Sequence, residues 1–399
     1  MNINKRLQSP NRGGFATDGK TNVLSWLRRL STLSEGDVVA LLRNTHQGII
    51  HGPPREVAII GASHIGVELT KRCSELGITV QGIFDDSVTI QGATVAGFTV
   101  QATDRLDMIE RHVPIVLATH RLLGLTHRLS TAGFVHVWPF ALLHCAWPQL
   151  FIPHPFYANI QKDLLINAHK YAWLADQLAD QSSCRTLDAI IAFRLTLDVH
   201  HLEPVLQPHT YFPPDIIALG SQETYLDGGA YCGDTIQQFL HRTNGSYANI
   251  VAFEPSPGSY STLKAAFAKY PEFRCIRACL YSSDTHLSFN GTDARDATIS
   301  SDSSSLAVPA FCIDSLPEAT TLTLIKLNIE GGETDALFGA RKTIRQASPS
   351  LAVAAYHRAE DLWRLVEIIQ KNNPGYKFFL RQHDGGIIET VLYATKPVD

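Results

Sequence analysis

The sequence lacks the features that would mark it as a secreted, membrane or nucleic-acid-binding protein. Its seven cysteines include no C-x-x-C pair, so neither a disulfide framework nor a structural zinc site is expected. No apolar run approaches the roughly 18 residues of a membrane-spanning helix. The first residues lack the apolar core of a signal peptide. The net charge of −4 argues against a nucleic-acid partner. We therefore expect a cytoplasmic protein.

The 399 residues are too many for one typical core, and 45% of them are hydrophobic, which is ordinary for globular domains. Pattern and composition predict a tail with short helices (1–50), a Rossmann-like domain of nucleotide-binding type (51–135), a helical connector (136–214) and a second α/β domain (215–399). The connector is expected to contain helices at 159–179 and 186–195, and the second domain a helix at 333–344. The polar run at 292–305 is expected to be a mobile loop that closes over the site of the second domain.

The first α/β domain contains a strand, a glycine turn, a helix and a second strand that ends in an acid. The apolar run 56–60 leads into Gly-Ala-Ser-His-Ile-Gly at 61–66, and the strand 79–84 precedes Asp85. This order is typical of a nucleotide-binding βαβ unit. Ser63 replaces the middle glycine of a dinucleotide fingerprint and would crowd a pyrophosphate. The pattern therefore favours a docking module or a site for a nucleotide-linked substrate over NAD.

The same pattern returns in the second domain. A strand at 223–226 leads into the turn Asp-Gly-Gly-Ala-Tyr-Cys-Gly at 227–233, and the strand 250–253 precedes Glu254. Glycines without a Cβ allow the backbone to approach a ligand closely, and the next helix offers free N–H groups to a carboxylate. Glu254 is placed to accept hydrogen bonds from ribose hydroxyls. Asp227 would repel a pyrophosphate but suits an ammonium and a sulfonium, which favours S-adenosylmethionine over NAD.

The C-terminal segment predicts a mixed sheet. Two apolar runs flank a His-Asp-Gly-Gly turn at 383–386, as in an antiparallel hairpin. Alternating strands and helices that end in a hairpin form a sheet that is not purely parallel. A dinucleotide-binding dehydrogenase domain would normally remain parallel.

Five blocks between residues 225 and 394 together resemble the FkbM-type S-adenosylmethionine-dependent methyltransferase family. They are YLDGGAYCGDT, AFEPSP, LIKLNIEGGETDALFGA, AAYHRAEDLW and FFLRQHDGGIIETVLYA. The resemblance implies an α/β fold of the class I methyltransferase type, with a Rossmann-like mixed sheet and a terminal antiparallel hairpin. Members of the family typically methylate hydroxyls of sugars, glycolipids, polysaccharides or secondary metabolites. The cofactor-binding residues that we predict are Asp227, Gly228, Gly229, Ala230, Gly233, Asp234, Glu254, Pro255 and Asn328.

One of these residues departs from the family pattern. The block usually reads IK-x-D-V-E-G, and Asn328 stands in the place of its acid. An amide is no general base and a poor metal ligand, so we expect no metal and an activity that survives chelation.

Two residues are candidates for the base that an attacking hydroxyl needs. Glu330 and His357 both follow predicted strands, at the edge where ligand sites of α/β sheets lie. Histidine is the commonest base, because its pKa lies near neutral pH. We therefore expect an O-methyltransferase of the EC 2.1.1 type acting on a small-molecule or glycan acceptor. Two alternatives are a nicotinamide-dependent oxidoreductase that uses the N-terminal unit, and a non-catalytic binding protein. The oligomeric state is not predicted.

Overall fold

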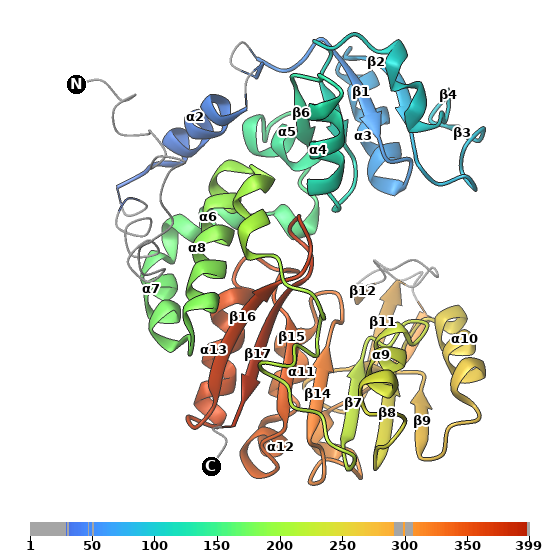
Figure 1. The fold of residues 1–399 in the computed structure, drawn as a ribbon, viewed down its shortest axis with the longest axis vertical. Coiled ribbons are helices and arrows are strands. Elements are labelled where there is room, and N and C mark those ends of the chain that lie inside the picture. The colour runs from blue at the N-terminus through green and yellow to red at the C-terminus, as the bar shows by residue number, and fades with distance from the viewer. Residues whose placement is uncertain are drawn as a thin grey trace. The chain divides into compact units, whose positions relative to one another are not determined.

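The computed structural model describes residue 29 and residues 32–46, 48–49, 52–290, 298–299 and 306–396. They divide into two compact units (Figure 1). The first comprises 1–172, 185–206 and 384–388, and the second comprises 173–184, 207–383 and 389–399. No helix in the described part of the chain has the length and hydropathy that a membrane crossing requires.

A parallel sheet with the strand order β2-β1-β5-β6 forms the core of the first unit. Its strands are β1 (Glu56–Ile60), β2 (Thr79–Phe84), β5 (Ile115–Leu117) and β6 (Val137–Pro139). The first two occupy the predicted ranges, and β6 extends the sheet beyond the predicted boundary at 135. A short ribbon of β3 (Thr94–Val95) and β4 (Phe98–Thr99) follows β2. The α/β fold predicted for this part of the chain is confirmed as a parallel sheet.

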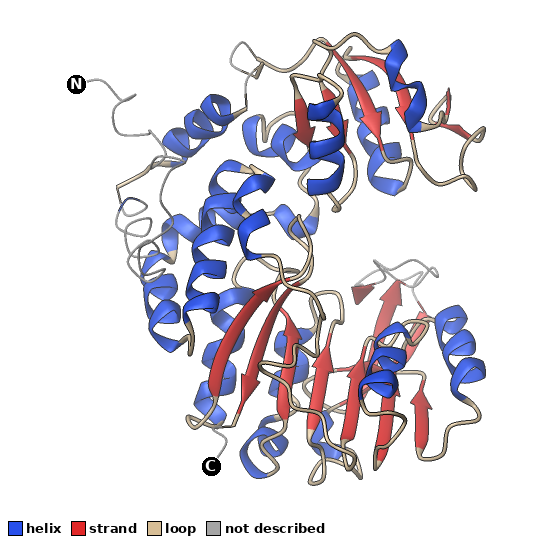
Figure 2. Cartoon of the chain, viewed as in Figure 1, coloured by secondary structure: helices blue, strands red, loops and turns tan. Residues whose placement is uncertain are grey.

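Helices precede and alternate with the strands of the first unit (Figure 2). They are α2 (Glu35–Thr45), α3 (His64–Glu75), α4 (Leu123–Thr131) and α5 (Phe140–Ala146). Ser34 starts α2 with a capping box, in which its hydroxyl accepts from the Asp37 N–H and the Asp37 carboxylate accepts from the Ser34 N–H.

The predicted connector helix at 159–179 is in fact two helices, α6 (Ile160–Ile166) and α7 (Ala168–Gln177). Asn167 interrupts them, and its side-chain amide donates to Asp163 at 2.7 Å. The Asn167 N–H completes the first helix by donating to the Asp163 carbonyl oxygen at 2.8 Å, and the backbone of Asn167 then leaves the helical region with φ −104° and ψ +24°. Helix α8 (Gln181–Thr196) follows and covers the range 186–195 predicted as helical.

The second unit contains a larger mixed sheet with the strand order β16-β17-β15-β14-β7-β8-β9. Its parallel strands are β7 (Thr224–Gly228), β8 (Asn249–Phe253), β9 (Phe273–Ile276), β14 (Leu324–Leu327) and β15 (Ser350–Ala354). The strand β17 (Thr390–Thr395) runs antiparallel to both β15 and β16 (Lys377–Gln382). The predicted mixed sheet and terminal hairpin are thus confirmed.

The loop of this hairpin is longer than predicted. The strands end at Gln382 and begin again at Thr390, so the connection is not limited to the turn at 383–386. The stretch 384–388 packs with the first unit, where a Cβ on Gly385 would lie 2.3 Å from Leu123. The stretch 384–388 therefore belongs to the first unit and takes no part in the β16–β17 ladder.

Both faces of the larger sheet are covered. Helices α9 (Asp234–Arg242) and α10 (Pro257–Phe267) place Ile236, Phe239, Leu263 and Phe267 in one apolar core with β7 and β8. Helices α11 (Glu333–Phe338), α12 (Arg341–Gln346) and α13 (Asp361–Asn372) lie on the other side (Figure 1). The single helix predicted over 333–344 is therefore wrong. It breaks at Gly339, where a Cβ would approach the Tyr281 carbonyl oxygen to 2.1 Å.

A small second sheet, with the order β10-β13-β11-β12, was not predicted. Its strands are β10 (Cys279–Leu280), β11 (Thr285–Asn290), β12 (Thr298–Ile299) and β13 (Leu306–Phe311). Apart from β12, the predicted mobile loop at 292–305 lies outside the described residues.

Candidate functional site

The sheet extends from β7 in both directions. Strands β8 and β9 follow on one side of β7, and β14 and β15 follow on the other side. In open α/β sheets, ligands bind at such switch points, beyond the carboxyl ends of the strands. The loop after β7 is the glycine turn, and the loop after β14 carries Asn328 and Glu330. Residue Glu254 follows β8, and His357 comes shortly after β15. The structure therefore gathers most of the predicted site residues at one edge.

The glycines of the second turn are required by packing within the protein. Gly229 and Gly233 have φ angles of +75° and +88°, whereas Gly228 has no positive φ. A Cβ on Gly229 would lie 1.9 Å from the Asn328 carbonyl oxygen, and one on Gly233 would lie 2.2 Å from the Phe267 ring. These positions exclude side chains even without a ligand.

Glu254 ties the glycine turn to the next strand. Its Oε2 accepts from the Tyr231 N–H at 2.8 Å, and its Oε1 accepts from the Ser256 N–H at 2.9 Å. Burial raises the pKa of Glu254, and the N–H groups of Ser256 and Tyr231 oppose the rise. Each carboxylate oxygen has two lone pairs, so one on each oxygen is left for another donor.

Asp227 is ion-paired inside the protein. It is fully buried, and its Oδ1 lies 2.8 Å from Nζ of the buried Lys326. The same ammonium donates to the carbonyl oxygens of Gly228 at 3.2 Å and Gly229 at 2.8 Å. Burial raises the pKa of Asp227, while Lys326 opposes the rise. Because Lys326 balances the charge of Asp227, this carboxylate does not favour a cationic cofactor over NAD, contrary to our prediction.

Asn328 and Tyr356 connect the ends of β14 and β15. The Tyr356 hydroxyl donates to the Asn328 side-chain oxygen at 3.4 Å. Burial, together with the carboxylates of Glu389 and Glu330, raises the pKa of Tyr356 well above its ordinary value. Tyr356 is therefore a neutral hydrogen-bond donor at neutral pH.

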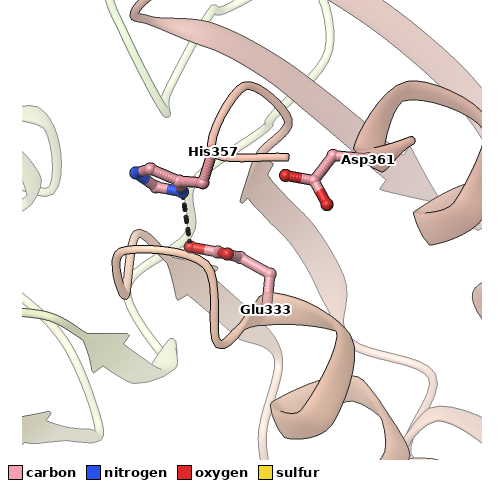
Figure 3. Close-up of side chains that lie close together, drawn as sticks. All are labelled: Glu333, His357 and Asp361. Carbon is pink, nitrogen blue, oxygen red and sulfur yellow. Dashed lines mark ion pairs between the residues drawn. The ribbon is translucent and has the colours of Figure 1, made fainter. Parts of the chain in front are cut away.

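Two glutamates enclose the imidazole of His357. Its Nδ1 lies 3.0 Å from Glu333 Oε1 (Figure 3), and its Nε2 lies 3.4 Å from Glu330 Oε2. Glu333 Oε1 also accepts from the Ile329 N–H at 2.8 Å. Burial lowers the pKa of His357, but the two carboxylates outweigh burial and raise it to about 10. The ring is therefore protonated at neutral pH.

Asp361 lies beside this pair (Figure 3). It is buried and accepts from the Arg358 N–H at 2.8 Å, and burial together with Glu333 raises its pKa to about 7. Among the described residues, Glu333, His357 and Asp361 form the one group whose ligand atoms are close enough for a metal ion, within 4.8 Å of one another. His357 and Glu333 already form an ion pair with each other, so a metal ion at this place would have to replace that contact.

The structure adds residues that the sequence argument missed. Glu333 and Asp361 were not proposed, although each lies within four positions of a candidate, Glu330 or His357. Lys326 is a further buried residue of this edge, and its partner is Asp227. Asp234 is exposed at the start of α9, and Pro255 is half-buried next to Glu254.

The glycine turn of the first unit has the same internal support. Asp85 Oδ2 accepts from the Ala62 N–H, and its Oδ1 accepts from the Ser87 N–H, both at 2.8 Å. A Cβ on Gly61 would lie 2.5 Å from the Ala118 carbonyl oxygen, so packing explains this glycine. The rings of His120 and His154 lie 4.8 Å apart near this turn, a grouping that the sequence spacing did not reveal.

Comparison with known proteins agrees with this geometry. Residues 227–382 match the model of the methyltransferase FkbM domain, which confirms the predicted resemblance for this part of the chain. The methyltransferase FkbM from Methylobacillus flagellatus KT superimposes with a TM-score of 0.71 at 22% identity, covering 94% of this chain and 99% of that chain. That likeness establishes the methyltransferase fold. No curated protein matches the sequence.

Two other solved structures resemble only part of the chain. An rRNA methylase from Streptococcus thermophilus has a TM-score of 0.30 at 12% identity, covering 45% of this chain and 90% of that chain. The fibrillarin of Aeropyrum pernix, in complex with S-adenosyl-L-methionine, has a TM-score of 0.29 at 11% identity, covering 45% of this chain and 70% of that chain. Both likenesses are too weak to support an argument.

Proposed function

We propose that the protein is an S-adenosylmethionine-dependent O-methyltransferase that acts on a hydroxyl of a sugar, a glycolipid or polysaccharide, or a secondary metabolite. One observation carries the proposal. The glycine turn and Glu254 meet at the switch point of a mixed sheet, within the segment that matches the FkbM methyltransferase model.

The residues at this edge fit the cofactor. Glu254 retains acceptor capacity for two ribose hydroxyls, one on each carboxylate oxygen. Helix α9 begins directly after the turn, and its cap residue Gly233 has no side chain that could occupy the first N–H groups, which suits a carboxylate at the helix N-terminus. The Asp227–Lys326 pair keeps the floor of the turn free of net charge. Asn328 and Tyr356 lie across the edge, where the acceptor has to approach.

When bound, S-adenosylmethionine supplies a methyl group on a positively charged sulfur. The acceptor oxygen gains this methyl group and loses its proton, and the sulfur remains as a neutral thioether in the product. The tasks left to this chain are to position the two reactants and to receive that proton.

Calorimetric titration of the full-length protein separates this function from its alternatives. We expect binding of S-adenosylmethionine and S-adenosylhomocysteine and no binding of NADH. Binding of NADH alone would instead favour an oxidoreductase that uses the first glycine turn. Transfer of a labelled methyl group to a panel of glycans and hydroxylated metabolites then tests turnover. Cofactor binding without transfer to any acceptor would favour a non-catalytic binding protein.

A further inference from the structure

The titratable side chains at the carboxyl edge of the larger sheet differ in their exposure to solvent. The side chain of His357 is 1% exposed and that of Glu333 is 1% exposed, whereas the side chain of Glu330 is 23% exposed. Glu330 thus lies at the open end of a row of three groups, Glu333, His357 and Glu330, whose inner end is buried.

We propose that Glu330 is the catalytic base that takes the proton of the acceptor hydroxyl, and that His357 is a positioning residue held in place by Glu333. This inference rests on the proposed function and assigns the base within it.

The contacts of His357 are incompatible with its acting as the base. Both of its ring nitrogens face carboxylate oxygens, at 3.0 and 3.4 Å, and the ring is closed to solvent. An acceptor oxygen cannot reach a ring nitrogen without displacing one of these glutamates. A histidine between two carboxylates is a cation that orients its partners, as it does in many catalytic sites.

The backbone of Glu330 supports the same assignment. Its φ is +54°, in the left-handed region that a side chain with a Cβ rarely adopts, and Gly331 follows with φ +95°. Strained positions of this kind cost about 1–3 kcal/mol and are retained where the surrounding structure enforces them, often at active sites. Here the strain directs a carboxylate toward His357 at the switch point of the sheet.

The other acids of this edge are less suited. Asp227 is fully buried on Lys326, and Glu254 is 7% exposed and holds two backbone N–H groups. Asp361 is 1% exposed. Glu389, which precedes β17 at the same edge, is partly exposed like Glu330 and provides a matched comparison.

In the reaction, the bond between the acceptor oxygen and its hydrogen breaks, and the proton moves to a carboxylate oxygen of Glu330. The protonated carboxyl then returns the proton to solvent, for which its partial exposure provides a route. No oxidant or additional reactant is needed.

The test compares Glu330→Gln with Glu389→Gln in the full-length enzyme. We expect Glu330→Gln to lower kcat by about 10²–10⁴-fold, the range typical of a lost general base, and to leave S-adenosylmethionine affinity within about twofold. Glu389→Gln should retain wild-type kcat. Glu330→Asp, which keeps the charge on a shorter side chain, should recover part of the activity and guards against a loss that comes from misfolding.

A second measurement needs no turnover. Nitrogen-15 NMR of the cofactor-free enzyme should show the His357 ring, assigned by its loss in His357→Gln, with both nitrogens protonated at neutral pH. A neutral His357 ring, or wild-type kcat in Glu330→Gln, would overturn the assignment. Failure of the wild-type enzyme to bind S-adenosylmethionine would instead refute the proposed function itself.

Discussion

Asp85 and Glu254 make the same pair of hydrogen bonds in the two glycine-turn units of the chain. Each carboxylate accepts one N–H from its glycine turn, from Ala62 or Tyr231, and one N–H from the residue two positions further along. This arrangement fixes the turn against the end of the second strand of a βαβ unit. An acid at this place therefore has a structural role whether or not a nucleotide is bound, and only a comparison of the two can reveal a binding role.

The first prediction compares these two acids. Glu254→Ala should weaken S-adenosylmethionine binding by about 1.5–3 kcal/mol, since it removes a charged acceptor of hydrogen bonds. Asp85→Ala removes the equivalent structural bonds in the other unit and should leave this affinity unchanged. Calorimetric titration of both variants provides the measurement. Unchanged affinity in Glu254→Ala would remove Glu254 from the cofactor site.

The second prediction concerns the buried pair of Asp227 and Lys326. Lys326→Met leaves the Asp227 carboxylate buried without its partner, and should lower the free energy of unfolding by about 3–5 kcal/mol. Adding Asp227→Asn to that variant removes the uncompensated charge and should recover part of the loss. Urea denaturation of the two variants tests this, and a double variant less stable than Lys326→Met would contradict it.

The third prediction separates backbone strain from steric overlap. Gly229 and Gly245 have nearly equal φ angles, +75° and +73°, but only at Gly229 would a Cβ meet another atom, the Asn328 carbonyl oxygen. Gly245→Ala should cost about 1–2 kcal/mol, the penalty of the left-handed backbone alone. Gly229→Ala should be clearly more destabilising. Similar melting temperatures for both variants would show that the turn moves aside easily.

The fourth prediction is a pH dependence of stability. The pKa of folded His357 is about 10, above the ordinary 6.5, so its proton stabilises the fold fully below pH 6.5. This contribution is lost as the pH rises from 6.5 toward 10, because the unfolded chain no longer holds the proton. The melting temperature should fall over this range, and fall less steeply in His357→Gln. Parallel curves for the two proteins would contradict the raised pKa.

Much of the fold could be predicted from local pattern. The first strands, 56–60 and 79–84, are short apolar runs bounded by a glycine turn and by acids, and the structure reproduces their ends. The terminal hairpin follows from two apolar runs around Asp-Gly-Gly. Breaks inside helices could not be predicted as well, because the one at Gly339 depends on the Tyr281 carbonyl oxygen, which is distant in sequence.

The sequence predicted which residues lie at the candidate site, but it did not predict which of them are charged. The strand ends identified Glu254, Glu330 and His357 as neighbours of the glycine turn. Whether a histidine is neutral depends on which groups face its ring, and Glu333 reaches His357 only after β14 and β15 pair. The sequence therefore left Glu330 and His357 as alternative bases, and our proposal of Glu330 depends on the contacts that the structure gives His357.

The outermost strand of the larger sheet is protected by a segment far away in sequence. Leu178 forms a β-bridge with Phe378 of β16, the Ala179 N–H donates to the Phe378 carbonyl oxygen at 2.8 Å, and the Ser183 hydroxyl accepts from the Leu380 N–H at 2.9 Å. Exposed strand edges promote association between chains. A fragment that begins at residue 215 would lack this cover, so the methyltransferase part of the chain depends on residues before its motifs to remain monodisperse.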